Sequence, residues 1–581
     1  MRIYISYIVV LLLSLSCSDI SIVNEEINKG IEKSIKSFSK KSYLYHEYTD
    51  SYIYHQNDPY SIENFQKAYE QLLTSKSKQR LTLSQINEIS GNNLKLKATH
   101  YALRIYPKNE TEQWKIELME DIRVSYIPFD YVQIPEDSLA VDKNNVPHYS
   151  EVSKYKVIYD DYITSDDVSE KAEEIIMPIL YVVWPCEKQL PDNIDYEIDY
   201  EVFIPLYDET RTKELVGLEP ETLQLLENEA ISIALGVSPQ ISSTTKSVIV
   251  RTLNGKICQQ DHLLNSNVPL SNLKIQFKLG SNIWEVYSQL DGRFSITSNI
   301  PLESTCSFIF HHPRWKITTD NNATPIVITW GTVASNWSDQ SEVYMSLEYS
   351  RPVYEIHRAV SFFYFGSHEI PKHYCDEGIR IKALNYEDPE TSAFFSYAQI
   401  GNPSITVYNN NRYNENIIIG TVLHELGHFV HYRQRGDYTG SAYEGFLSVN
   451  RLFMESYASY VGWYLGEEYY STLGWNIVLD DESITGQGRQ LWRKTDQVDD
   501  EAYYSPIFVD LVDNLNQKNR WGMAYNNDQI SDVPHAIINE MAAECTNWSS
   551  VKLYLDMYCG IYYTVEEYYN FIEPYEFWFS V

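Results

Sequence analysis

The chain is 581 residues long, 44% of its residues are hydrophobic, and its formal net charge is −34 at pH 7. This length is too great for one hydrophobic core, so we expect about two to four domains of ordinary globular composition. The acidity excludes a nucleic-acid partner, because phosphate backbones are bound by basic surfaces and the sequence offers none. We interpret the charge as a solvated acidic surface, with a preference for basic substrates as the alternative.

The first 16 residues indicate a signal peptide. Arg2 supplies a positive charge, and Ile3–Ser16 forms an apolar stretch that is too short to span a bilayer. The small residues before Cys17 resemble the end of bacterial lipoprotein signals, in which this cysteine becomes the lipidated first residue. Ser14 departs from the leucine that is usual there, and secretion without a lipid is the alternative. The resemblance implies a lipid anchor at Cys17, membrane attachment and a place in the cell envelope at the outer membrane.

The next 200 residues predict a tether, a helical segment and a β-rich domain. Residues 17–40 are polar and lysine-rich, which is typical of a tether, and residues 41–90 favour helices. Residues 91–245 predict a β-rich domain with a helix at 218–235, since strings such as HYALRIYP, ILYVVWP and YEIDYEVFIP alternate apolar with polar residues. The strings MEDIRVSYIPFDY and YEIDYEVF resemble N-terminal regions of uncharacterised Bacteroidetes lipoproteins, which indicates a kind of bacterium and no chemistry.

Residues 247–330 predict a compact all-β domain. Short strands occur in SVIVRTLNGKI, NLKIQFKL and GRFSI, and we expect hairpin turns at Asn254-Gly255 and Asp291-Gly292. The pattern resembles the carboxypeptidase regulatory-like, transthyretin-type β-sandwich of bacterial surface proteins. This resemblance implies a spacer or a binding module for a glycan or another surface partner, and a purely structural domain is the alternative.

Six cysteines remain after Cys17, and they are too few for a disulfide scaffold in a chain of this length. None has the close spacing of a structural zinc site. Export from the cytoplasm would permit bridges between Cys258 and Cys306 or between Cys545 and Cys559, but the sequence does not decide between bridges and buried thiols. The six are Cys186, Cys258, Cys306, Cys375, Cys545 and Cys559.

Residues 340–581 carry the most informative part of the sequence. We expect a helix at 354–365, a strand at 378–384, and one or two strands at 392–408 before a longer helix. The longer helix is Asn414–Gly436, NENIIIGTVLHELGHFVHYRQRG, in which apolar residues recur at helical spacing. This order of elements predicts a catalytic domain of mixed α and β structure.

The motif HELGH places His424, Glu425 and His428 on one helix. Residues four apart lie on the same helical face about one turn apart, so the two imidazoles can bind one metal ion. The glutamate between them is then in place to activate a water molecule. The motif therefore predicts a zinc (Zn²⁺) hydrolase, while the alternative is an ordinary buried helix with core histidines.

Catalytic zinc takes three protein ligands and leaves one position open. We expect Glu455 to be the third ligand, on a second helix packed closely against the first. Gly427 on the first helix lets another backbone approach, and small residues surround Glu455, which favours close helix packing. These small residues are Ser456, Ala458, Ser459 and Gly462.

Two other residues remain candidates for the third ligand. His431 lies three residues after His428, but one straight helix does not easily aim three side chains at one tetrahedral centre, so we expect it beside the ligands or facing the substrate. Glu444, in SAYEGF, follows a loop and offers a carboxylate.

The pattern of His424, Glu425 and His428 with Glu455 27 residues later (455 − 428) resembles the gluzincin class of zinc metallopeptidases. The longer string HELGHFVH also resembles oligopeptidase zincins. The metzincin pattern is excluded, because His431 and Gln434 stand where it requires glycine and histidine.

One position departs from the gluzincin pattern: Ser459 stands where gluzincins often carry an acidic residue that orients a zinc histidine. Either the serine takes over this task or another group does. In zincins an edge strand before the motif helix pairs with the substrate peptide, and Ser404–Tyr408 is our candidate for it, with an ordinary sheet strand as the alternative.

The resemblance implies a mechanism. His424, His428 and Glu455 would hold zinc, which lowers the pKa of a bound water molecule, and Glu425 would act as general base and then return the proton to the leaving amine. The oxyanion needs a further donor. Tyr503, Tyr504 and His535 are candidates for that role, with packing or surface aromatics as the alternative for each.

The sequence as a whole therefore predicts a multidomain α+β protein whose function is zinc-dependent hydrolysis of protein or peptide substrates outside the cytoplasm. The alternative is a surface adhesin or glycan-binding accessory lipoprotein with a structural or inactive zincin domain. A zinc hydrolase for a non-peptide bond is a third hypothesis, because a ligand set alone does not select the substrate.

Overall fold

The computed structural model describes only part of the chain. The described residues are 53–55, 58–74, 81–91, 96–129, 131–133, 156–159, 173–205, 218–236, 250–261, 263–319, 323–337, 342–347, 352–376, 378–384, 393–396, 403–409, 415–435, 440–475, 507–513, 530–545 and 548–575. The predicted signal peptide, the tether, the lipidation site Cys17 and the candidate donors Tyr503 and Tyr504 lie outside them.

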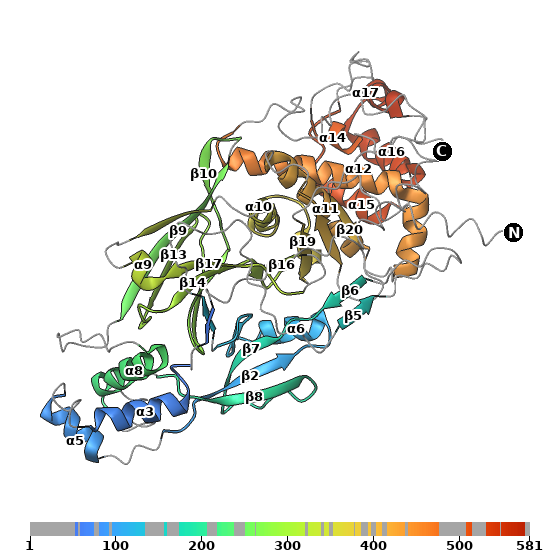
Figure 1. Ribbon diagram of the computed structural model, residues 1–581. Helices are drawn as coiled ribbons and strands as arrows, with labels where there is room; N and C mark the ends of the chain where they lie inside the picture. The colour runs from blue at the N-terminus through green and yellow to red at the C-terminus, as the bar shows by residue number, and fades with distance from the viewer. Residues whose placement is uncertain are drawn as a thin grey trace, which may run out of the picture.

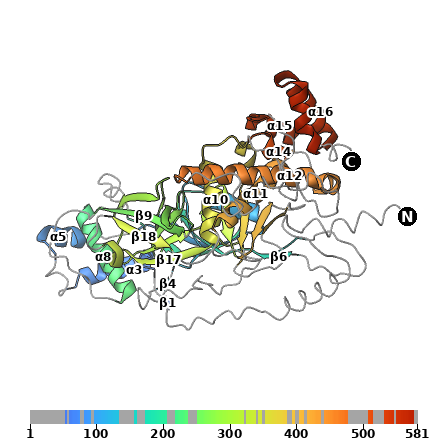
Figure 2. The same cartoon turned by 90° about the horizontal axis from the view of Figure 1, so that it is seen from above.

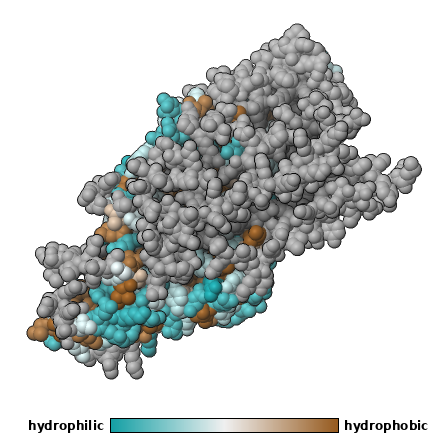
Figure 3. Space-filling view, in the orientation of Figure 1, coloured by the Kyte–Doolittle hydropathy of each residue, from teal (hydrophilic) through white to brown (hydrophobic). Residues whose placement is uncertain are grey.

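The described part is of the α+β class, as predicted. Its first helices and its last helices lie at opposite ends of the molecule, with β-sheets between them (Figure 1). Figure 1 shows the N-terminal helices and sheet in blue and green at one end, β-sheets in the middle, and the orange and red C-terminal helices at the other end. On the face seen in Figure 3, the described surface of the N-terminal end mixes hydrophilic and hydrophobic residues. None of the described helices is long and apolar enough to cross a membrane.

The described N-terminal part combines four helices with a sheet of strand order β3-β7-β2-β8. The helices α3 and α8 pack together, and the hydroxyl of Tyr60, just before α3, donates to Glu227 of α8 over 2.7 Å. The helix predicted at 218–235 is confirmed as α8, which ends at left-handed Gly236. The predicted helical segment therefore shares a hydrophobic core with the β-rich part rather than standing apart.

The elements of this part have the following bounds: β1 (Ile53–His55), α3 (Ile62–Leu72), α5 (Leu83–Gly91), β2 (His100–Tyr106), α6 (Glu110–Glu117), β3 (Arg123–Ser125), β4 (Tyr131–Gln133), β5 (Lys156–Tyr159), β6 (Glu173–Ile176), β7 (Leu180–Pro185), β8 (Asp195–Val202) and α8 (Pro220–Leu235). Two further strand pairs, β1 with β4 and β5 with β6, lie outside the main sheet.

The middle part consists of two sheets that face each other. One contains β10, β9, β13 and β18, and the other has the order β12-β11-β14-β17. The rings of Phe277 from one sheet and Phe294 from the other lie 6.2 Å apart in a shared core. The bounds are β9 (Arg251–Asp261), β10 (Ser266–Pro269), β11 (Lys274–Leu279), β12 (Asn282–Tyr287), β13 (Arg293–Ser298), β14 (Thr305–Ile309), β17 (Val327–Thr332), α9 (Val333–Trp337) and β18 (Val343–Leu347). We call this part the sandwich.

One of the two predicted hairpin turns is confirmed and the other is wrong. Asp291-Gly292 lies in the turn between β12 and β13, where Gly292 has a φ of +77°. Asn254-Gly255 instead lies inside β9, and a Cβ at Gly255 would be 2.4 Å from the ring of Phe294. The glycine is there because an aromatic ring on the neighbouring strand covers it, not because the chain turns.

The C-terminal part is built on a sheet of strand order β15-β16-β19-β21-β20. The strands β16, β19 and β21 are parallel, whereas β20 is antiparallel to β21 and forms the edge of the described sheet. The predicted edge strand at 404–408 is therefore wrong, because β20 pairs along its outer side. The strand bounds are β15 (His311–His312), β16 (Trp315–Thr318), β19 (Ile379–Ala383), β20 (Ala393–Ser396) and β21 (Ser404–Val407).

The predicted division between residues 330 and 340 does not separate these sheets. The strands β15 and β16 precede it but join the C-terminal sheet, and β18 follows it but pairs with β9 of the sandwich. Strand pairing thus connects the sandwich and the C-terminal part in both directions.

Helices cover the C-terminal sheet. The helix predicted at 354–365 and the strand predicted at 378–384 are confirmed as α10 and β19. Figure 2 shows α12 across α10 and α11, with further helices beyond it. The bounds are α10 (Val353–Phe365), η2 (Lys372–Cys375), α11 (Glu415–Gln434), α12 (Gly440–Thr472), α14 (Ile507–Asp510), α15 (His535–Glu544), α16 (Trp548–Tyr562), α17 (Val565–Ile572) and η3 (Glu573–Tyr575).

The six cysteines after Cys17 are all free thiols, and neither of the two bridges left open by the sequence is formed. Cys258 lies in β9 and Cys306 in β14, which belong to different sheets of the sandwich. Five of the six thiols are buried, so they contribute to packing as small apolar side chains.

A buried ionic network joins the sandwich to the helices that cover the C-terminal sheet. Arg358 of α10 donates to Asp261 of β9 over 2.6 Å and to the hydroxyl of Tyr469 of α12 over 2.6 Å. Both charged side chains are fully buried, at 1% and 0% exposure. A buried guanidinium requires its carboxylate, so this contact fixes the sandwich relative to α10 and α12.

We predict that Asp261→Ala destabilises the protein by about 3–5 kcal/mol, because it leaves the Arg358 guanidinium buried without its counter-ion. Urea unfolding followed by tryptophan fluorescence measures this loss. Asp291→Ala is the matched control, since its partner Arg293 is 55% exposed and we expect an unchanged midpoint. Equal midpoints for the two variants would contradict the assigned role of the buried pair.

Candidate metal centre

Helix α11 presents two histidines on one buried face. His424 and His428 are one turn apart, with ring centroids 4.9 Å apart and ring planes at 84°. The apolar residues that the sequence predicted to bury this helix are at most 3% exposed. They are Ile418, Val422, Leu423, Leu426 and Val430. The hydrophobic contacts therefore hold the helix in place and keep both imidazoles on the same side of it.

Helix α12 lies directly against α11 at the motif. A Cβ at Gly427 would be 2.9 Å from the Cα of Ala458 and 3.0 Å from the Cβ of Val461. Such distances are shorter than ordinary carbon contacts, so only glycine fits between the two helices. The close approach that the sequence predicted for Gly427 is confirmed. It brings the preceding turn of α12, which carries Glu455, within reach of the two histidines.

Glu455 of α12 completes a group of three side chains. Its Oε2 lies 3.4 Å from Nε2 of His424 and 3.3 Å from Nε2 of His428. One ligand atom from each of the three residues lies within 4.8 Å of the others, and among the described residues no other group of this kind is found. The three side chains thus converge on one point between α11 and α12.

The spacing of these atoms fits a shared zinc ion better than direct ion pairs. Ligands about 2.0–2.1 Å from a tetrahedral zinc ion lie about 3.3–3.4 Å from one another. Charge-assisted hydrogen bonds between nitrogen and carboxylate are shorter, at about 2.7–2.9 Å. The separations at Glu455 match the first arrangement, and the donor set of two imidazoles and one carboxylate is one that catalytic zinc sites use.

The two carboxylates of the site differ in their electrostatics. Burial opposes ionisation of Glu455, yet the charges and hydrogen bonds of His428 and His424 hold its pKa well below the usual range. Burial raises the pKa of Glu425 to about 7; His428 opposes this rise, Glu455 adds to it, and the main-chain N–H of Phe395 opposes it. Glu455 is therefore suited to bind a cation, whereas Glu425 exchanges a proton near neutral pH.

One oxygen of Glu425 has no hydrogen-bond partner although it is buried. The side chain is 2% exposed, and its Oε2 makes no hydrogen bond with the described residues. Such an atom is costly unless a small molecule such as water reaches it. This atom can therefore accept a hydrogen bond or a proton from a small molecule that reaches it.

The structure brings Ser459 next to His424. Its Oγ lies 3.5 Å from Nδ1 of His424, one helical turn beyond Glu455. A neutral hydroxyl at this distance is a weaker partner than a carboxylate at hydrogen-bonding distance. Ser459 therefore occupies the position of the orienting group that the sequence left in question, at the outer limit of a hydrogen bond.

Of the other two candidates for the third ligand, His431 does not join the group. His431 is fully buried against Phe453 and Tyr457, and Nε of Arg435 lies 3.4 Å from its Nε2. Burial lowers the pKa of His431 to about 3, so it is a neutral core side chain. Glu444 lies in the first turns of α12, where the described residues include its backbone but not its side chain.

His535, a candidate oxyanion donor, contacts α12 beyond Glu455. Its ring stacks on Tyr464 with centroids 3.8 Å apart, and its Nδ1 contacts the hydroxyl of Tyr460. Neither of these contacts is with His424, His428 or Glu455, so the role of His535 stays a prediction. The candidates Tyr503 and Tyr504 are not among the described residues.

The site contains one residue that the sequence did not indicate. Phe395 of β20 donates its main-chain N–H to Glu425, and its ring is stacked on His428 with centroids 6.4 Å apart. The string AFFS predicts a strand, but only the antiparallel pairing of β20 with β21 brings it beside α11. This contact depends on the fold, and no local pattern in the sequence signals it.

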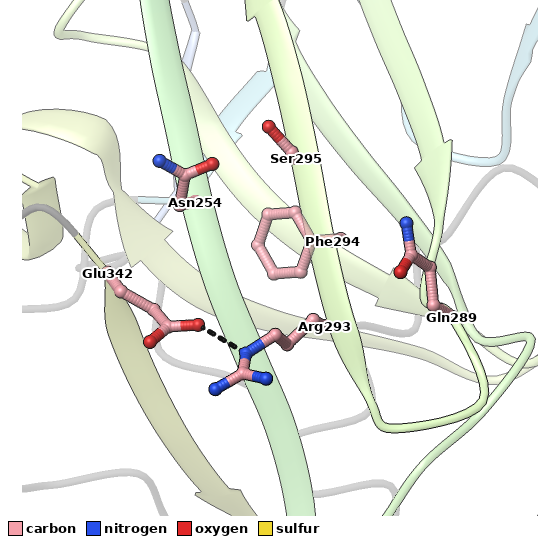
Figure 4. A pocket seen from close by; sticks show the side chains of 6 residues that line it. All are labelled: Asn254, Gln289, Arg293, Phe294, Ser295 and Glu342. Carbon is pink, nitrogen blue, oxygen red and sulfur yellow. Dashed lines mark hydrogen bonds and ion pairs between the residues drawn. The ribbon is translucent and has the colours of Figure 1, made fainter.

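A hollow lies on the sandwich, far along the chain from the motif (Figure 4). Its charged side chains satisfy each other, since Nε of Arg293 donates to Glu342 over 3.0 Å. The lining contains no cluster of nucleophiles or metal ligands. Its residues are Asn254, Gln289, Arg293, Phe294, Ser295 and Glu342.

Comparisons with known proteins assign no family to the chain: no family model matches it, and no curated protein is significantly similar to it.

We predict that Gly427→Ala destabilises the protein by about 1–3 kcal/mol, because the added methyl group overlaps the backbone of α12. Thermal unfolding without added metal measures this effect. Gly466→Ala is the matched control on α12, where nothing lies within 4 Å of the added Cβ; we expect it to be neutral or to stabilise by up to about 1 kcal/mol. A Gly427→Ala protein as stable as the control would refute the close helix contact.

Proposed function

We propose that this chain is a zinc-dependent peptidase, held in the bacterial cell envelope by a lipid on Cys17. The observation that carries the proposal is the convergence of His424, His428 and Glu455 on one point, at separations that suit a tetrahedral ion. The general base expected from the sequence, Glu425, lies buried beside that point with a free oxygen. Gluzincin-type metallopeptidases combine these groups in the same way.

The residues divide the chemistry between them. His424, His428 and Glu455 would hold zinc, which supplies a Lewis acid that acidifies a coordinated water molecule and polarises a substrate carbonyl. Glu425 takes the proton from the attacking water at Oε2 and passes it to the amine nitrogen of the leaving group. Its pKa near 7 suits both transfers at neutral pH. Ser459 helps to orient the ring of His424.

The position of β20 at the edge of the described C-terminal sheet supports a peptide substrate. An extended peptide can pair with the edge of a sheet through its main chain, whatever its side chains are. The strand β20 forms the edge of the described C-terminal sheet, and its residue Phe395 contacts Glu425 directly. A peptide added along β20 would therefore run past the general base, so the substrate would be a protein or peptide in extended form.

The remaining parts of the chain agree with an envelope protein. We propose a transthyretin-type domain for the two facing sheets of the sandwich, as a module that contacts a glycan or another surface partner. The buried network around Arg358 favours a fixed position of this module relative to the catalytic part, rather than a flexible spacer. The N-terminal part would then lie between the lipid tether and the catalytic part.

The decisive experiment measures metal content and cleavage together. We expect the purified full chain to contain one zinc ion, by inductively coupled plasma mass spectrometry, and to cleave a general unfolded protein substrate. Glu425→Gln is the matched variant, because it keeps the side-chain volume but removes the base; it should retain zinc and lose at least about 10²-fold in kcat. If the protein binds zinc but shows no cleavage that Glu425→Gln abolishes, the adhesin or glycan-binding alternative is supported instead.

A second prediction concerns the orienting group. We expect Ser459→Ala to weaken zinc binding by up to about tenfold, since groups that orient a metal histidine typically contribute 10–100-fold and this hydroxyl lies at the outer limit of a hydrogen bond. Competition with a chelator of known affinity measures the change. Ser456→Ala, at a position one helical turn before Ser459, serves as control; a loss equal to that of Ser459→Ala would argue against a specific role.

A further inference from the structure

Phe395 lies at the centre of an aromatic group beside the metal-binding face of α11. Its ring is stacked on His428 at 19°, and its centroid lies 6.0 Å from that of Tyr432 and 6.2 Å from that of Phe429. Phe429 is fully buried, whereas Phe395 and Tyr432 are half-buried. The partly exposed rings are thus the two that border the metal ligand His428.

Tyr432 continues the face that carries the metal ligands. It lies four residues after His428, which itself lies four residues after His424, so the three side chains follow one another along one side of α11. The guanidinium of Arg433 lies 5.8 Å from the Tyr432 ring and 5.4 Å from the Phe429 ring. The apolar surface formed by Phe395 and Tyr432 therefore begins one helical turn from the metal-binding atoms.

The main chain of β20 determines how a bound peptide meets this surface. In an antiparallel pair, alternate residues turn their main-chain groups toward the partner strand and away from it. Phe395 donates its N–H to Glu425, so its main-chain groups turn away from β21 and toward the outer edge of the described sheet. A peptide strand added at that edge would pair through the carbonyl oxygen of Phe395, since the N–H is already taken by Glu425. The peptide residue opposite Phe395 would then place its side chain, on the same face of the sheet, against the Phe395 ring.

We propose that Phe395 and Tyr432 form a subsite for an aromatic side chain of the substrate, next to the bond that is cleaved. This proposal rests on the proposed peptidase function and adds the class of side chain that the site selects. Two partly exposed rings provide both apolar area and ring edges, which favour a further ring over an aliphatic or charged group. The subsite adjoins His428 and Glu425, so occupancy places the neighbouring peptide bond at the reacting groups.

The test compares peptides that differ at one position. Cleavage sites are first located by mass spectrometry, and kcat/KM is then measured for peptides carrying Phe, Leu, Ala or Glu at each position flanking the cleaved bond. We expect the wild type to favour Phe over Ala at one flanking position. Phe395→Ala and Tyr432→Ala should each lower the ratio of kcat/KM for the Phe peptide to kcat/KM for the Ala peptide by about three- to tenfold, whatever they do to the rate on the Ala peptide itself. Phe395→Leu should restore part of the loss.

Two controls separate a subsite from a structural effect. The zinc content of each variant must equal that of the wild type, and Tyr344→Ala, at an aromatic residue of the sandwich that is 50% exposed, should change no rate. Equal losses on the Phe and Ala peptides, or a wild-type preference for Ala or Glu, would overturn the subsite. If either result is found while cleavage still depends on Glu425, only the subsite is refuted and the peptidase proposal stands.

Peptide binding tests the subsite even without turnover. Isothermal titration calorimetry of the zinc-loaded Glu425→Gln protein should show tighter binding of the Phe peptide than of the Ala peptide, and Phe395→Ala in the same background should remove the difference. If the wild type cleaves nothing but this difference is found, the proposed activity fails and the subsite stands. If the two peptides bind equally well, the subsite is refuted.

Discussion

The distance between α11 and α12 at Gly427 is the constraint on which the candidate site depends. A side chain at this position would overlap the backbone of Ala458, so the helices approach this closely only because residue 427 has none. Glu455 lies one turn before Ala458, and its carboxylate reaches both imidazoles only at this helix separation. The glycine inside the motif therefore matters as much to the geometry as the three converging side chains, because a wider spacing would leave the two histidines without Glu455.

Buried polar contacts hold the helices that carry the site against the rest of the molecule. Arg358 connects α10 to the sandwich and to the far end of α12, and on the other side of the sheet Glu117 and Glu110 of α6 pair with Lys316 over 3.1 Å and Arg380 over 3.0 Å. Buried ion pairs contribute little net stability compared with apolar packing, but each charge excludes arrangements that leave it unpaired. The N-terminal part and the sandwich thus define the position of the C-terminal sheet.

The sequence predicted the parts of this structure that depend on local spacing. The two histidines, the glutamate between them and the small residues near Glu455 follow from helical periodicity, and the structure brings the expected third ligand to the histidines. It did not predict the features that depend on strands distant in sequence. Gly255 resembled a turn because the ring of Phe294 that covers it comes from another strand, and the edge strand was misplaced because the antiparallel return of β20 leaves no local signal.

The same fold separates the roles of two carboxylates that the sequence alone leaves chemically equivalent. Glu425 and Glu455 are both buried, and burial by itself raises the pKa of each carboxyl group. The difference arises from their partners. Both His428 and His424 face Glu455 and hold its pKa well below the usual range, whereas His428 and the main-chain N–H of Phe395 only partly offset the effect of burial on Glu425, to which the negative charge of Glu455 adds. One carboxylate is thereby kept ionised next to two imidazoles, while the other can take up a proton near neutral pH. The division of labour follows from the position of each helix, and therefore from the packing at Gly427.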